Sequence, residues 1–221
     1  YGWKHAQALP SGNYISPQVL ALLKQVKARR VMDLGSGNGA MCGLMSSHGF
    51  SVVGCEYDQQ GCELARQGYP GLAFYNLGVQ DDPSALISQE GLFDAVTSTE
   101  VIEHLYSPHL LPQFARKCLK PGGHLIISTP YHGYLKNLAL AITGKWDDHH
   151  TPLWHGGHIK FWCRRTLTEL LESNGFEVLG FHGVGRAPYL WKSMILVAKS
   201  TQDSEEYPQK TSPSTNNMPT P

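Results

Sequence analysis

The chain has 221 residues, and its 18 basic and 18 acidic side chains give a formal net charge of zero. This length fits one domain with a tail, and the 41% hydrophobic content is enough to form a core. The neutral charge and the absence of a basic stripe argue against a nucleic-acid partner. No apolar run approaches the roughly 20 residues of a membrane helix. Five cysteines without a C-x-x-C pair are typical of a reducing compartment, so we expect a cytoplasmic protein.

Strand-like and helix-like segments alternate along most of the sequence. Ser16 and Pro17 are typical of a helix N-cap followed by proline in the first turn. The alternation predicts parallel strands with helices on both faces, an α/β sandwich. Apolar or alternating patterns predict strands at residues 30–34, 51–56, 72–75, 93–97, 124–128, 176–181 and 194–198. Helices are expected at about residues 17–26, 40–47, 62–66, 110–119 and 165–173.

The alternation defines the expected domain boundaries. We expect an N-terminal segment at residues 1–15, one domain at residues 16–199, and a tail at residues 200–221. The tail is rich in Ser, Thr, Pro and Asn, which predicts disorder. Residues 131–163 interrupt the pattern with a long insertion rich in His, Gly and Trp. Insertions of that length are usually functional, and we expect this one to act as a lid.

A glycine-rich turn follows the first predicted strand and opens a helix. It reads Asp-Leu-Gly-Ser-Gly-Asn-Gly from Asp33 to Gly39. Glycines permit the tight turn and a close ligand approach, and free amides at a helix start meet polar groups. Glu56, at the end of the second strand, is suited to accept hydrogen bonds from a ribose diol. A carboxylate at Asp33 fits a cationic amino group better than a pyrophosphate.

These motifs resemble those of the class I S-adenosylmethionine-dependent methyltransferases. The resemblance rests on residues 31–39, 54–58, 93–96, 100–105 and 119–130, and is closest to the ubiquinone-biosynthesis-type O-methyltransferases. It implies a Rossmann-like, seven-stranded, mostly parallel sheet whose last strand is antiparallel. It also implies S-adenosylmethionine as cofactor, bound by Asp33, Gly35, Ser36, Gly37, Gly39, Glu56, Tyr57 and Thr99.

The sequence departs from many relatives after the third strand. Those relatives carry an aspartate there that holds the adenine amino group, whereas residues 76–80 of this chain contain none. Either Asp81, displaced by a few residues, or Gln80 together with backbone groups is expected to take that role.

Glu100, Glu103 and His104 form an E-x-x-E-H pattern that carries the expected chemistry. On a helical turn this spacing places the three side chains on one face, and two carboxylates with an imidazole suit a hard divalent cation such as Mg²⁺. The resemblance implies a metal at the matching residues of quinone and RNA 3′-end methyltransferases. The same pattern is also common in methyltransferases without a metal, and His104 alone could then be the catalytic base.

Further histidines lie in the insertion, from His149 to His158, without a standard zinc spacing. A solvated loop that covers the substrate explains most of them. His158 stands apart, because the apolar residues Phe161 and Trp162 that follow it should dock on the core.

We therefore expect methyl transfer from S-adenosylmethionine to an oxygen of a small-molecule phenol, quinol or enol. The protein would mainly supply positioning and electrostatics. An N- or C-methyltransferase, an RNA 2′-O-methyltransferase, and an inactive nucleoside-binding module are the alternatives that the sequence leaves open.

Overall fold

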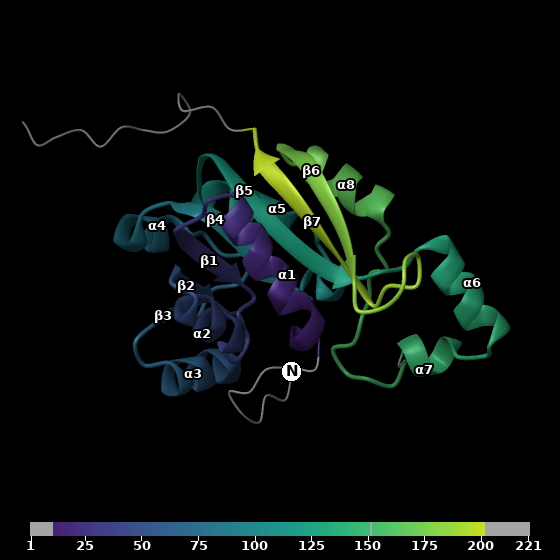
Figure 1. Ribbon diagram of the computed structural model, residues 1–221. Coiled ribbons are helices and arrows are strands. Elements are labelled where there is room, and N and C mark those ends of the chain that lie inside the picture. The colour runs from purple at the N-terminus through teal and green to yellow at the C-terminus, as the bar shows by residue number, and fades with distance from the viewer. Residues whose placement is uncertain (1–10, 151, 202–221) are drawn as a thin grey trace, which may run out of the picture.

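The structure, a computed structural model, describes residues 11–150 and 152–201, and its centre is a seven-stranded sheet (Figure 1). The strands are β1 Arg30–Leu34, β2 Ser51–Cys55, β3 Ala73–Tyr75, β4 Phe93–Thr99, β5 Leu119–Pro130, β6 Phe176–Val184 and β7 Ser193–Ser200. Their order across the sheet is β3-β2-β1-β4-β5-β7-β6. The last strand, β7, is antiparallel to both of its neighbours, and the other pairs are parallel. The expected mostly parallel sheet is confirmed.

Helices cover both faces of this sheet (Figure 1). They are α1 Gly12–Gln25, α2 Ala40–Ser47, α3 Gln59–Gly68, α4 Ser84–Glu90, α5 Leu110–Cys118, α6 Tyr134–Ile142, α7 Trp146–His150 and α8 Arg164–Glu172, with a 3-10 turn, η1, at Ile102–His104. Two buried clusters form the core, one on each side. Val31 packs with apolar residues of α1, α2 and α3, whereas the next residue, Met32, packs with those of α4, α5 and α8. Successive strand residues point to opposite faces, so an uninterrupted apolar strand serves both clusters.

The first helix begins earlier than predicted. It starts at Gly12, so Pro17 lies inside it and Ser16 is no N-cap. This helix buries one apolar face, formed by Ile15, Val19, Leu22 and Leu23. Because Ile15 belongs to that face, the face begins before the proline. Pro17 is the sixth residue of this helix, so the hydrogen bond that it cannot donate is the one to the carbonyl of Asn13 near the helix start. The helix start expected at Ser16 and Pro17 is therefore wrong.

At the other end, β7 includes Ser200, one residue beyond the expected end of the domain. The expected disordered tail lies, apart from Ser200 and Thr201, outside the described residues. Within the described part of the chain, no helix is long and apolar enough to cross a membrane.

The insertion at residues 131–163 contains the helices α6 and α7. They stand away from the sheet, beyond the carboxyl end of β5 (Figure 1). The described residues from Asp147 to His158, expected to form a solvated loop that covers the substrate, are largely exposed but begin within the short helix α7. The segment after α7 returns to the core, where the amides of Ile159 and Lys160 both donate to the carbonyl oxygen of Glu103. The insertion is thus tied to η1, at the same edge of the sheet where β1, β2 and β4 end.

Candidate active site

The glycine-rich turn links the end of β1 to α2. Gly35, Gly37 and Gly39 have φ angles of 82°, 53° and 80°, which disfavour any residue with a side chain. The amides of Gly35 and Ser36 both donate to the carbonyl of Cys55, at 2.8 and 2.9 Å, and so join the turn to the end of β2. A Cβ atom on Gly35 would lie 2.4 Å from Cγ2 of Val101. Glycine is therefore required here for both conformation and space.

Asp33 lies beneath this turn and is only 1% exposed. Its carboxylate accepts hydrogen bonds from the Thr97 hydroxyl at 2.7 Å and the Cys42 thiol at 3.5 Å. Burial raises the pKa of Asp33 to about 6. Among the described residues no cationic side chain forms an ion pair with it. A buried carboxylate without a counter-ion favours a cationic ligand.

Glu56 closes the other side of the turn, at the end of β2. Its Oε2 accepts from the amide of Gly37 at 2.6 Å, and its Oε1 accepts from the amide of Asp58 at 2.8 Å. The side chain of Asn76 donates to the carbonyls of Glu56 and Tyr57, both at 2.8 Å, and fixes this segment. Burial raises the pKa of Glu56. Two backbone donors hold its carboxylate in one orientation at the ligand-facing edge.

A cavity of about 1240 Å³ joins these groups. Seven of the eight residues expected to bind the cofactor line it, namely Asp33, Gly35, Ser36, Gly37, Glu56, Tyr57 and Thr99. Tyr57 is 70% exposed and forms part of the rim. Gly39 does not line the cavity, because it packs instead against Ala65 and Phe74, where a Cβ atom would come within 2.9 Å.

The cavity also has walls that the sequence motifs did not reveal. Ser11, Gly12 and Ile15 from the start of α1 face it, and no local pattern marked them. Of the two candidates for the adenine edge, Gln80 lines the cavity together with Gly78 and Val79. Asp81 does not line it, since its carboxylate accepts from the amide of Gly78 at 2.7 Å.

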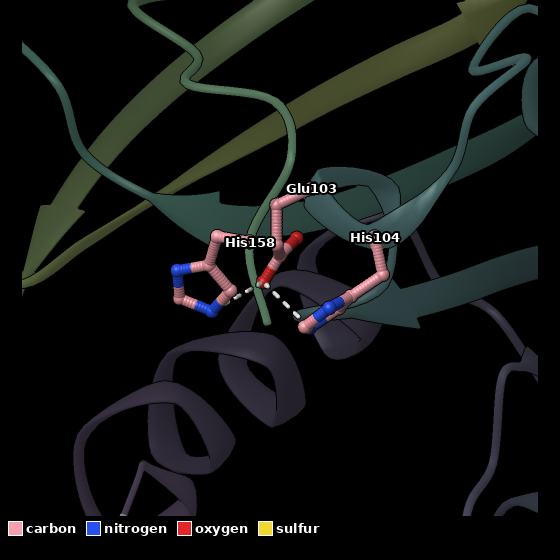
Figure 2. A group of neighbouring side chains, drawn as sticks. All are labelled: Glu103, His104 and His158. Atoms are coloured by element: carbon pink, nitrogen blue, oxygen red, sulfur yellow. Dashed lines mark ion pairs between the residues drawn. The ribbon is translucent and has the colours of Figure 1, made fainter. Parts of the chain in front are cut away.

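An acidic and imidazole cluster lies next to this cavity. Figure 2 shows the imidazoles of His104 and His158 turned toward one carboxylate oxygen, Oε1 of Glu103. Each imidazole Nε2 is 4.0 Å from that oxygen. Ligand atoms of the three residues lie within 4.8 Å of one another. His104 lines the cavity itself.

One carboxylate oxygen of Glu103 is buried and lacks a hydrogen-bond donor among the described residues. Oε2 of Glu103 accepts from Thr129 at 3.0 Å, whereas the buried Oε1 has no hydrogen-bond partner among the described residues. Nδ1 of His104 contacts the carbonyl of Gly157 at 3.2 Å. A carbonyl only accepts, so this Nδ1 carries the proton and the Nε2 of the neutral ring presents its lone pair to Glu103. Burial lowers the pKa of His104, which favours the neutral ring.

Two electron-pair donors that face each other repel unless an electron-poor atom lies between them. Burial, followed by the charge of Glu100, raises the pKa of Glu103 well above its usual range. Burial is the main cause that lowers the pKa of His158 to about 4. The donor set of one carboxylate and two imidazoles suits a divalent cation. These residues therefore fit a metal ion.

Glu100 is not part of this cluster, although the sequence places it there. Its φ of 55° lies in the left-handed region, and the 3-10 turn begins only at Ile102, so the expected single helical face does not form. Its carboxylate accepts instead from the hydroxyls of Ser128 at 2.9 Å and Ser193 at 3.2 Å. Burial raises its pKa to about 7. His158, from the returning insertion, occupies the third position.

The sequence comparisons agree with this geometry. A family model described as a methyltransferase domain matches residues 4–180. The chain belongs to the class I S-adenosylmethionine-dependent methyltransferases.

Two curated relatives are both named ubiquinone biosynthesis O-methyltransferase. One, from Coxiella burnetii, is 24% identical over 84% of this chain and 81% of its own length. The other, from Dinoroseobacter shibae, is 31% identical over 72% of this chain and 64% of its own length.

Solved structures are similar in fold. Magnesium protoporphyrin IX methyltransferase from Synechocystis with bound S-adenosylhomocysteine has a TM-score of 0.63 and 18% identity, over 84% of this chain and 81% of that chain. The methyltransferase domain of a bacterial Hen1 has a TM-score of 0.63 and 21% identity, over 85% and 97% of the two chains. At these identities the likeness establishes the fold.

Proposed function

We propose that this methyltransferase transfers the methyl group of S-adenosylmethionine to an oxygen atom of a small phenol, quinol or enol. The observation that carries the proposal is the cluster of Glu103, His104 and His158 beside the cofactor cavity. An imidazole of this cluster could accept the proton of an acceptor hydroxyl, or a metal ion bound by the cluster could lower the pKa of that hydroxyl. The names of the curated relatives, ubiquinone biosynthesis O-methyltransferase, support the same acceptor atom.

The cofactor site follows from the turn between β1 and α2. When bound, S-adenosylmethionine supplies the sulfonium methyl group that the acceptor attacks. Asp33 offers its unpaired carboxylate to the cationic amino group, and Glu56 offers its fixed carboxylate to the ribose hydroxyls. Gly35 and Gly37 let the ligand approach the backbone, and Tyr57 and Thr99 complete the wall. The volume of about 1240 Å³ exceeds the roughly 300–1,000 Å³ of common ligand sites, which leaves room for an acceptor.

The acceptor side is formed by the cluster. The neutral imidazole of His104 directs Nε2 toward Glu103 and is suited to take a proton from an acceptor hydroxyl. A divalent cation held by Glu103, His104 and His158 would occupy this Nε2 lone pair, and it would then lower the pKa of such a hydroxyl in place of the imidazole base. Glu100, held by two serines, lines the same cavity beside His104.

An oxygen acceptor makes better use of this cluster than a nitrogen acceptor. A phenol becomes a strong nucleophile only when its proton is removed, whereas a neutral amine already has a free electron pair. A buried carboxylate with two imidazoles is the kind of proton-accepting or metal-binding group that the phenol requires.

Methyl transfer with catechol tests the proposal. We expect a methyl ether from S-adenosylmethionine and catechol, and a loss of about 100-fold or more in kcat for Glu103→Gln, within the usual range for acid–base groups. The affinity for S-adenosylhomocysteine should stay within about twofold in this variant. His155→Ala, an exposed histidine of the same segment, is the matched control. Methylation of aniline in place of catechol would overturn the oxygen assignment.

A further inference from the structure

A second cavity of about 250 Å³ lies beside the cofactor cavity. Its walls come from α1, the carboxyl end of β5, α6 and the segment that joins β6 to β7. Glu100 lines both cavities, so they are separated there by the thickness of one side chain. A molecule that reaches from one to the other would pass next to the proposed acceptor site.

The walls of this second cavity carry an excess of positive charge. Lys136, Arg186 and Lys192 line it, and Glu100 is the one carboxylate among the described lining residues. Glu100 already accepts hydrogen bonds from two serine hydroxyls. None of the three cations forms an ion pair with a described carboxylate. The site therefore has cations to offer a ligand.

Lys136 is the strongest sign of a built site. On α6 its neighbours Leu135 and Leu138 are 51% and 41% exposed, whereas Lys136 is only 5% exposed. This arrangement inverts the usual preference, in which leucine is buried and lysine faces water. The Lys136 ammonium donates to the carbonyl of Lys192 at 3.3 Å, a weak substitute for lost hydration. Stability alone does not explain why the helix faces this way.

The surroundings of Lys136 are themselves positive. Burial lowers the pKa of Lys136 to about 8, and the charge of Arg186 contributes in the same direction, whereas the charge of Glu100 opposes the shift. The Lys192 ammonium lies over the ring of Tyr14, 5.3 Å from its centroid, and both residues line this cavity. Two cations that destabilise each other within one cavity are stabilised together when an anion binds between them.

We propose that this second cavity binds an anionic oxygen group, a carboxylate or a phosphate, carried by the methyl acceptor. The inference rests on the proposed function, since it identifies the acceptor as an acid. The Lys136 ammonium would bind the anion from inside, and Arg186 would bind it from the rim. The nucleophilic hydroxyl would then extend past Glu100 toward His104.

Calorimetry on the full chain saturated with S-adenosylhomocysteine tests the anion site. The probes are benzoate, phenyl phosphate and the neutral benzyl alcohol. We expect benzoate or phenyl phosphate to bind and benzyl alcohol to bind about tenfold more weakly or not at all, as for the loss of a charge-assisted hydrogen bond. Binding of benzoate alone identifies a carboxylate site, and binding of phenyl phosphate alone identifies a phosphate site.

The variants are Lys136→Met and Arg186→Gln, and each should weaken binding of the preferred anion about tenfold or more. Lys145→Gln is the matched control, because Lys145 is an exposed lysine of the same insertion that lines neither cavity. Arg186 is exposed, so its replacement keeps the test valid even where Lys136→Met alters folding. No binding of either anion, or unchanged binding in the Arg186→Gln variant, would overturn the inference.

A comparison of catechol with 3,4-dihydroxybenzoate separates this inference from the proposed function. The inference predicts a lower KM for the carboxylate-bearing acceptor, and loss of that preference in Arg186→Gln. Methylation of catechol without any anion preference would leave the proposed function standing and refute the anion site. Anion binding in calorimetry without methylation of either phenol would support the site and refute oxygen methylation of phenols.

Discussion

The carboxylate of Glu56 should dominate affinity for the nucleoside part of the cofactor. Glu56→Ala removes the acceptor for the ribose diol, and it leaves the amides of Gly37 and Asp58 without the bonds they now make at 2.6 and 2.8 Å. The loss for an orphaned polar group is about 1–3 kcal/mol, which weakens binding roughly 5- to 150-fold. Glu56→Gln keeps the shape and one acceptor oxygen, so we expect an intermediate loss.

Isothermal titration calorimetry with S-adenosylhomocysteine measures this effect directly. Glu63→Ala is the matched control, since Glu63 is an exposed glutamate on the adjacent helix α3 that accepts a hydrogen bond from Gln59 and does not line the cavity. Its affinity should equal that of the parent. A Glu56→Ala protein that unfolds at the parent temperature and binds S-adenosylhomocysteine within twofold of the parent would refute the assignment.

Further predictions concern stability, the glycine turn, the metal and the insertion. Burial raises the pKa of Asp33 from 3.8 to about 6, so the folded protein holds a proton that the unfolded chain releases, and stability falls as pH rises through that window. Asp33→Asn should therefore stabilise the ligand-free protein at pH 7 by up to about 3 kcal/mol in thermal unfolding, yet weaken S-adenosylhomocysteine binding. Gly35→Ala should lower both the unfolding temperature and the affinity for S-adenosylhomocysteine. Gly49 has a φ of 88° and nothing within 4 Å of a Cβ atom, so Gly49→Ala should lower the unfolding temperature through backbone strain and leave that affinity unchanged. A chelator should abolish methyl transfer and added Mg²⁺ or a similar cation should restore it; activity that a chelator leaves unchanged would exclude the metal. In hydrogen exchange, the amide of Ile159 should be protected before ligands bind, because it donates to the carbonyl of Glu103. If the insertion acts as a lid, the amides of α6 and α7 should gain protection only when cofactor and acceptor are both bound.

The sequence predicted the sheet, and it predicted that the glycine turn and Glu56 lie together at one cavity, because both depend on local patterns. Apolar runs of five or so residues mark β1 and β2, and the glycines after β1 mark a turn that few other residues tolerate. The carboxyl ends of parallel strands meet at one edge, so Asp33 and Glu56 come together without any further information. Gly39, which the sequence groups with the cofactor-binding residues, does not line the cavity. It packs against Phe74, and a glycine required for packing cannot be distinguished in the sequence from one required for binding.

The acceptor side could not be predicted in the same way, because it depends on how a distant segment folds back. The spacing of Glu100, Glu103 and His104 fits a helical turn, but the backbone at Glu100 is left-handed and sends its carboxylate to Ser128 and Ser193. His158 reaches Glu103 only because the two amides that follow it bond to the carbonyl of Glu103.

Lys136 is a second residue whose environment could not be predicted from the sequence, because its burial depends on how the whole insertion folds. The sequence places residues 134–142 in the insertion without predicting a helix there. Only the structure shows that these residues form α6, with Leu135 and Leu138 exposed and Lys136 buried. The buried charge has a cost that the surrounding residues offset only in part, because its hydrogen-bond partner is a carbonyl and Arg186 is repulsive, while Glu100 is the one charge that favours it. An anionic acceptor would supply the missing charge. We therefore propose that the cofactor binds at the glycine turn and that the insertion, through Lys136, helps to select the acceptor.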